Sequence, residues 1–305
     1  MKTVLSNRTI NKGMKAVPAC LFCLVLTTFL TATASKAAGF TNSLGMRFVT
    51  VSGLSNVQFC VWLTRVQDFR AFVSDRANNG GYEYTNGTTP WIVTSNDSAH
   101  VTFEYGWNNP GFPQRDNCPV VCVNWYDAHA FCSWLTRKER AEGKIAANQT
   151  YRLPTDAEWS LAAGLTGERG GTPAEKSMNI KDVYLWGTDW PPPPGAGNFG
   201  GEEAKDKDWY PPLRVIAGYN DGYPRTSPVG RFAPSRYGLY DMAGNAGEWC
   251  EDIYRDVPHL RVWRGSTWNC VWPGNLWLST RGFDVIDTRN SNVGFRIVLA
   301  SGSKE

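Results

Sequence analysis

The most reactive side chains in this sequence are thiols. An even number of cysteines follows residue 34, and they could form disulfides in an oxidising compartment, although their spacing fixes no connectivity. Cys132 falls on the apolar face of a predicted helix, where a reduced, buried thiol is expected. No zinc site is expected, because His100, His129 and His259 are scattered and no CxxC pair remains beyond residue 34. The six cysteines are Cys60, Cys118, Cys122, Cys132, Cys250 and Cys270.

A second chemistry is suggested by two carboxylates, Asp241 and Glu248, which bracket a glycine-bearing turn whose carbonyls can point inward. Calcium prefers six to eight hard oxygen ligands, and carboxylates combined with the carbonyls of one tight loop supply them. In the alternative interpretation the two acids cap a turn without metal, and Asp221-Gly222 is an ordinary hairpin turn. Any metal here would be structural, because nothing nearby indicates an open coordination position.

The N-terminus has the layout of a signal peptide. Lys2, Arg8, Lys12 and Lys15 precede an apolar run over residues 16–30 and small residues at 31–34. A membrane anchor would need about twenty apolar residues, and the apolar run over residues 16–30 is shorter than that. We therefore predict a signal peptide over residues 1–34, a secreted or periplasmic protein, and no stable membrane span after cleavage.

Cleavage would lower the formal charge from +3 to −1, which leaves no electrostatic case for binding nucleic acid. Residues 35–305 contain no low-complexity linker and no clear internal repeat, so we predict one domain.

The elements that would position these groups are short. Strands are predicted over residues 46–51 and 59–63, followed by a helix that begins with a Thr64-x-x-Gln67 capping box. Residues 80–113 are predicted as loop, and residues 119–123 as a strand.

Asn124 is predicted to cap a second helix, and a strand near Tyr151 leads to a third helix through a Thr155-x-x-Glu158 capping box. Loops dominate beyond Gly164, and the fourteen tryptophans supply core area that long helices would otherwise give. The class is α+β, irregular and loop-rich, with few helices and short antiparallel strands.

Five segments together resemble the formylglycine-generating-enzyme (sulfatase-modifying-factor) family, in the family's order and over residues 42–299. They are Pro-Val-Val-Cys-Val-Asn-Trp-Tyr-Asp-Ala at 119–128, Arg-Leu-Pro-Thr-Asp-Ala-Glu-Trp at 152–159, Tyr-Gly-Leu-Tyr-Asp-Met-Ala-Gly-Asn-Ala-Gly-Glu-Trp at 237–249, Arg-Val-Trp-Arg-Gly at 261–265 and Asn-Val-Gly-Phe-Arg at 292–296. The resemblance implies a C-type-lectin-like fold with bound calcium and a surface groove for an extended peptide.

The resemblance also implies two calcium sites. The first would use Asp241, the carbonyls of Gly244 and Ala246, and Glu248. The second would use Asn198, the Phe199 carbonyl, Asp221 and the Tyr223 carbonyl.

Enzymes of this family oxidise a sulfatase cysteine to formylglycine with oxygen and copper(I) held between two thiolates. By position, Cys270 matches the first thiolate, but Asn275 stands where the second is expected, and Ser266-Thr267 replaces a Gly-Ser pair. An amide oxygen is a hard, neutral ligand that binds copper(I) poorly. A two-thiolate mechanism cannot run on Cys270 alone, and the alternative role for this cysteine is a free or disulfide-bonded loop residue, with Cys250 as a possible partner.

Three functions remain open. The first is a catalytically degenerate, calcium-stabilised module that binds a peptide, protein or glycan in a groove beside Thr267, lined by Trp268, Trp272 and Trp277. The second is an active oxidase with another copper ligand. The third is a display or adhesion module. The sequence does not predict the oligomeric state.

Overall fold

The computed structural model describes residues 39–84, 90–92, 100–101, 105–205 and 215–302. The predicted signal peptide lies outside these residues. Within them, no helix is both long and apolar enough to cross a membrane. Contacts group residues 37–305 into one compact unit.

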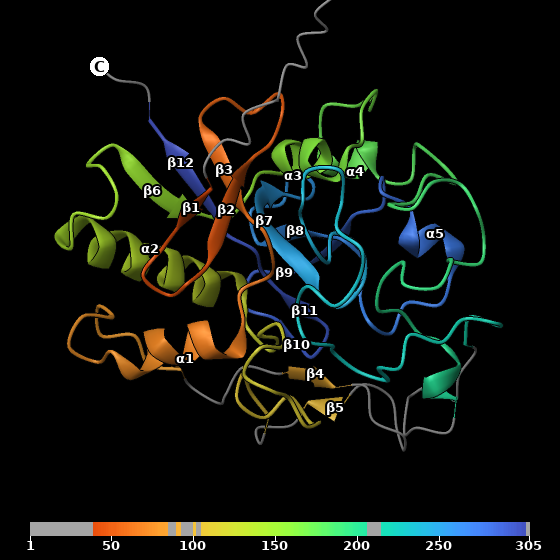
Figure 1. The fold of residues 1–305 in the computed structure, drawn as a ribbon, viewed down its shortest axis with the longest axis horizontal. Coiled ribbons are helices and arrows are strands. Elements are labelled where there is room, and N and C mark those ends of the chain that lie inside the picture. Colours follow the sequence, from red (N-terminus) through yellow and green to blue (C-terminus); the bar gives the residue numbers. More distant parts are fainter. Residues whose placement is uncertain (1–38, 85–89, 93–99, 102–104, 206–214, 303–305) are drawn as a thin grey trace, which may run out of the picture. The chain divides into compact units, whose positions relative to one another are not determined.

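The first sheet joins the two ends of this unit, because the last strand lies between strands from the front (Figure 1). All neighbours in it are antiparallel. Helix α2 (Trp125–Ala141) lies beside the sheet, and α1 (Val66–Ser74) packs against α2. In spatial order its strands are β1 (Phe40–Thr41), β2 (Arg47–Thr50), β3 (Val57–Cys60), β12 (Val298–Ser301) and β6 (Gln149–Arg152).

The second sheet carries the segments singled out around Glu248 and Arg264. Its order is β11 (Val293–Gly294), β7 (Gly247–Ile253), β8 (Leu260–Arg264) and β9 (Gly282–Val285), with β11 parallel to β7 and the other pairs antiparallel.

The remaining elements are short. A third sheet has the order β10 (Arg289–Asn290), β4 (Pro90–Ile92) and β5 (His100–Val101). The other helices are α3 (Asp156–Ala163), α4 (Pro173–Lys176), α5 (Pro273–Leu276) and the 3₁₀ turn η1 (Glu202–Ala204). Long loops connect these elements, so the predicted irregular α+β class is confirmed.

Local capping predictions are confirmed for two helices. Asn124 accepts the backbone N–H of Asp127 at the start of α2, and Thr155 accepts that of Glu158 at the start of α3. Each N3 carboxylate also accepts the N–H of its cap residue, which completes the capping box.

Other local predictions were wrong. The first helix is capped by Arg65 rather than Thr64, because the Asp68 carboxylate accepts both the Arg65 N–H and its guanidinium. Residues 119–123 make only an isolated bridge from Pro119 to Arg65, and Cys122 has φ 57°, which breaks an extended strand. Strands β4 and β5 lie in the predicted loop 80–113.

The core is rich in aromatic rings. Its largest cluster lies between α1, α2 and the first sheet, and a second cluster lies between α3 and the strands β7 and β8. Packing rather than exposure is therefore the role of many of the tryptophans. Among the described residues, the buried tryptophans are Trp107, Trp134, Trp159, Trp249 and Trp268.

Candidate functional site

Glu248 of β7 forms an ion pair with Arg296. Both residues are fully buried. Glu248 Oε1 accepts a hydrogen bond from Arg296 Nη2 at 2.8 Å. Glu248 Oε2 accepts hydrogen bonds from Arg296 Nε and Trp159 Nε1, each at 3.0 Å. The carboxylate is thus committed to a bidentate ion pair, which stabilises a charge that would otherwise be costly to bury.

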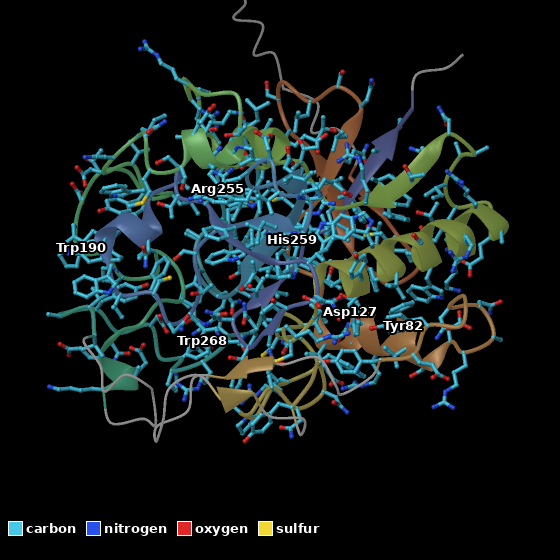
Figure 2. All side chains as sticks on the ribbon, turned by 180° about the vertical axis from the view of Figure 1, so that it is seen from behind. Tyr82, Asp127, Trp190, Arg255, His259 and Trp268 are labelled. Carbon is cyan, nitrogen blue, oxygen red and sulfur yellow. The ribbon has the colours of Figure 1, made fainter. Side chains whose placement is uncertain are left out.

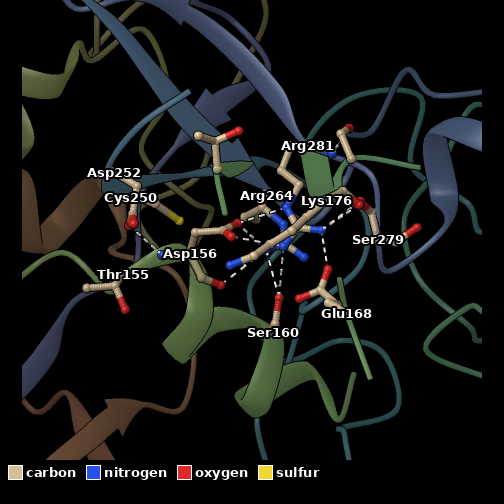
Figure 3. A network of polar contacts seen from close by, with 12 residues as sticks. Thr155, Asp156, Ser160, Glu168, Lys176, Cys250, Asp252, Arg264, Ser279 and Arg281 are labelled. Atoms are coloured by element: carbon tan, nitrogen blue, oxygen red, sulfur yellow. Dashed lines mark hydrogen bonds and ion pairs between the residues drawn. The ribbon is translucent and has the colours of Figure 1, made fainter. Parts of the chain in front are cut away.

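A second buried network lies where α3 meets β8 (Figure 3). Asp156, only 1% exposed, binds Arg264 through Oδ1 and Arg281 through both carboxylate oxygens. Ser160 adds its hydroxyl oxygen at 3.0 Å from Arg264 Nη1, and Glu168 pairs with Arg281. One aspartate therefore faces two guanidinium groups in the interior.

The first predicted calcium set gathers only in part. Asp241 is 4% exposed, and burial raises the pKa of its carboxyl to about 6. Its Oδ2 accepts the Gly230 N–H at 2.8 Å. Gly244 and Ala246 belong to the same turn, but Glu248, the fourth predicted ligand, is occupied by Arg296. This donor set therefore fits calcium less well than the sequence suggests.

The two predicted calcium loops touch each other. Asn245 donates its backbone N–H to the Asn198 carbonyl at 2.9 Å, and Asn198 forms a parallel bridge with Gly244. A Cβ at Gly244 would lie 2.3 Å from the Asn198 oxygen, and its φ is 79°. Only glycine permits this approach.

The second predicted set shows a better fit to a metal. Asn198 is fully buried, and its Oδ1 has no hydrogen-bond partner within the described residues, while its Nδ2 donates to the Arg225 carbonyl at 2.7 Å. Such an orphaned buried oxygen calls for a missing partner. Among the described ranges there is no group of three or more His, Cys, Asp or Glu side chains that could hold a metal, so carbonyl and amide oxygens would have to contribute.

Asp221 completes this set. Its two carboxylate oxygens accept the N–H groups of Phe199 and Tyr223, each at 2.8 Å, so three of the predicted ligand residues are in contact. Burial raises the pKa of Asp221 to about 7, and the nearby Glu203 carboxylate adds to the rise. A bound cation would relieve this burial of negative charge.

Cys270 lies half-buried, and all six cysteines of the described chain are unbridged, so the possible Cys250–Cys270 disulfide is absent. The Thr267 hydroxyl donates to Asn269 Oδ1 at 2.7 Å and lies 3.2 Å from Cys270 Sγ. Because its single hydrogen goes to Asn269, the threonine oxygen accepts from the Cys270 thiol.

Asn275, at the position of the missing thiolate, is exposed on α5, where its backbone N–H donates to the Trp272 carbonyl at 3.0 Å. The other cysteines of the hydrophobic clusters lie elsewhere, with Cys60 and Cys132 in the first cluster and Cys250 in the second, whereas Cys270 packs on the third.

The three predicted groove tryptophans lie in different environments. Trp268 is 1% exposed and packs edge-on against Phe112, with the Arg225 guanidinium 4.8 Å from its ring centre. Trp272 is 51% exposed at the start of α5, and Trp277 is half-buried with its Nε1 3.3 Å from the Tyr184 hydroxyl. Trp268 is therefore part of the interior, and Trp272 offers the most exposed ring.

The residue next to Thr267 was missed by the sequence analysis. Ser266 has φ 65° and is 7% exposed, and its Oγ has no hydrogen-bond partner in the described part of the chain. A left-handed conformation costs a non-glycine residue about 1–2 kcal/mol. The signal was present in the comparison of Ser266-Thr267 with the Gly-Ser pair of the family.

Ser266→Gly is therefore expected to increase the free energy of unfolding by about 1 kcal/mol, because relief of strain and of the buried hydroxyl exceeds the added chain entropy. Denaturant unfolding measures the change. Ser266→Ala is the control, since it removes the hydroxyl and keeps the strained Cβ. If the Gly variant were less stable than the Ala variant, the inference that the left-handed backbone at residue 266 is strained would be wrong.

Comparison with known proteins gives a family match over most of the chain. Residues 58–301 match the family profile described as sulfatase-modifying factor enzyme 1-like domain. A bovine protein named inactive C-alpha-formylglycine-generating enzyme 2 is 30% identical, covering 77% of this chain and 66% of that protein. The formylglycine-generating enzyme of Thermomonospora curvata is 33% identical, covering 65% and 50%. The chain thus spans about half to two-thirds of the length of these curated relatives.

Among solved structures, PvdO from Pseudomonas aeruginosa superposes with a TM-score of 0.51 at 20% identity, covering 85% of this chain and 82% of that one. CarF superposes with a TM-score of 0.50 at 19% identity, covering 87% and 96%. These two likenesses concern the fold alone. With the profile match and the paired motifs, the chain belongs to the sulfatase-modifying-factor family, that of the formylglycine-generating enzymes.

Proposed function

We propose that this chain is an exported, calcium-stabilised binding module that has lost the copper-dependent oxidase chemistry of its family. The observation that carries the proposal is the environment of Cys270. Its Sγ lies 3.2 Å from the Thr267 hydroxyl, and the position matched to the second thiolate is the exposed Asn275. Copper(I) binds far better to two soft thiolates than to one thiolate and an amide.

Calcium in this proposal stabilises loops. Asn198, Asp221 and the carbonyls of Phe199 and Tyr223 would hold one ion, which would supply charge compensation and fix the loops on either side of η1. The Asn198 Oδ1, which has no partner among the described residues, and the half-buried Asp221 carboxylate support this assignment. A second ion at Asp241 has weaker support, because Glu248 is paired with Arg296.

The ligand of the module would lie beside α5, where Trp272 is exposed and Trp277 is half-buried. Such rings suit an extended peptide, a protein surface or a glycan. Export rests on the pattern of residues 1–34.

The proposal is tested by copper(I) titration against a competing chelator, together with incubation of the purified chain with a Cys-x-Pro-x-Arg peptide and oxygen. We expect weak copper(I) binding and no aldehyde in the peptide by mass spectrometry. Conversion of the peptide by the unmodified chain would overturn the proposal in favour of an active oxidase.

Asn275→Cys provides a sharper comparison. If α5 lies where the family places its second thiolate, this variant should bind copper(I) at least about tenfold more tightly, equivalent to about 1.4 kcal/mol. Asn275→Ser is the matched control, since it changes the same exposed residue without adding sulfur. Equal affinities in the two variants would show that position 275 does not face Cys270.

A further inference from the structure

A cavity of about 570 Å³ lies at the end of α1, away from the residues of the proposed groove. Its volume falls within the roughly 300–1,000 Å³ typical of small-molecule sites. Three aromatic residues, Tyr82, Tyr84 and Trp107, line it together with polar residues that include Arg76, Glu83 and Asn108.

The aromatic rings are held in place from behind. The Tyr82 hydroxyl donates to Asp127 Oδ1 at 2.7 Å, and the Tyr84 hydroxyl donates to the Cys122 carbonyl at 2.8 Å. Figure 2 shows Tyr82 beside Asp127. Because both hydroxyls are used inside the protein, the tyrosines present ring carbon rather than polar atoms to the cavity.

A buried ion pair supports this wall. Arg289 binds Asp127 with Nε and Nη2 at 2.6 and 2.8 Å, and its guanidinium lies 4.5 Å from the centre of the Tyr84 ring. Arg289 is 5% exposed, and its Nη1 has no hydrogen-bond partner among the residues that the structure describes. These contacts fix the wall, and Arg289 Nη1 remains a donor without a partner among the described residues near the Tyr84 ring.

The polar part of the lining has balanced charge. Arg76 and Glu83 are both exposed and of opposite sign, and Asn108 is an exposed amide. Arg289, the other nearby cation, is neutralised by Asp127. Among the described lining residues a phosphate would find one uncompensated guanidinium, Arg76, and a quaternary ammonium would be repelled by the same cation.

We propose that this cavity binds a neutral saccharide. A pyranose has C–H groups on its faces, which pack against the electron-rich faces of aromatic rings, and hydroxyls at its edge, which bond to amide, carboxylate and guanidinium groups. The described lining residues offer both kinds of contact and carry no net charge. The site is separate from Cys270 and from the calcium loops, so it does not depend on the function proposed above.

The test is calorimetric titration of the purified full chain with neutral gluco-, manno-, xylo- and N-acetylglucosamine hexasaccharides, with choline and inorganic phosphate as the charged probes. We expect at least one hexasaccharide to bind saturably and neither charged probe to bind. Tyr84→Ala should weaken that binding by at least about tenfold.

Two further variants keep the outcome interpretable if Tyr84→Ala is unstable. Glu83→Ala and Asn108→Ala change exposed lining residues and should each weaken binding while the melting temperature stays unchanged. Trp190→Ala is the matched aromatic control, because Trp190 is 39% exposed and lies on the other side of the view in Figure 2. The proposal is overturned if no hexasaccharide binds, if choline or phosphate binds instead, or if Trp190→Ala alone removes binding.

Discussion

Replacing Asp156 with alanine is expected to lower the free energy of unfolding by about 3–5 kcal/mol, because removal of one partner leaves buried charge uncompensated. Two charges are affected here, since Arg264 and Arg281 are 0% and 4% exposed and both pair with this carboxylate. Glu168 still pairs with Arg281, but among the described residues no other carboxylate pairs with Arg264, which keeps only Ser160 and carbonyl oxygens as hydrogen-bond partners. Denaturant unfolding measures the change.

The matched control is Asp116→Ala. Asp116 also pairs with an arginine, Arg70, at 2.8 Å, but both side chains are exposed, and such pairs contribute little. We expect no measurable change in that variant. Equal effects of the two substitutions would show that burial of the Asp156 network does not determine its strength.

The stability supplied by Asp156 should also depend on pH. Burial alone would raise the pKa of its carboxyl, but Arg264 and Arg281 outweigh burial and hold the pKa below its ordinary value. The contribution is therefore complete above the unfolded-state pKa of about 3.9 and is lost as the pH falls through the folded-state pKa. The difference between the wild type and Asp156→Ala should shrink in acid.

Local signals in the sequence predicted the parts of the fold that local chemistry determines. Asn124 and Thr155 cap their helices as expected, since a capping box needs only neighbouring residues. The first cap was misplaced by one residue because Arg65 and Asp68 pair through side chains that a Thr-x-x-Gln pattern does not consider. The place of β12 between β3 and β6 depends on contacts across most of the chain, which no local pattern reveals.

The motifs that carried the family resemblance turn out to be partners of one another. Asp156 of one motif binds Arg264 of another, and Glu248 of a third binds Arg296 of a fourth. A sequence shows each residue but not its pairing, so the ion pair of Glu248 with Arg296 was not predicted. These motifs therefore contribute buried ion pairs to the folded scaffold.

The Glu248–Arg296 ion pair allows its own contribution to stability to be distinguished from that of bound calcium by experiment. Glu248→Ala is expected to lower the free energy of unfolding by about 3–5 kcal/mol, because it strands the fully buried Arg296 guanidinium. That loss should be equal in calcium and in a chelator, since it comes from the ion pair. Thermal and denaturant unfolding in both buffers measure it.

The effect of Asp221→Asn on stability should, in contrast, depend on calcium. In a chelator its free energy of unfolding should stay within about 1 kcal/mol of the wild type, because removal of a half-buried charge offsets the loss of one of the two N–H acceptors. In calcium at about a hundred times its dissociation constant, the wild type should gain about 2.7 kcal/mol and this variant should gain much less. Asp241→Asn tests the first set in the same two buffers. If calcium stabilises Asp221→Asn but no longer stabilises Asp241→Asn, the ion binds at the Asp241 turn instead. Identical unfolding of the wild type in calcium and in chelator would remove the metal from both sets, while the Glu248 effect would remain as a property of the scaffold.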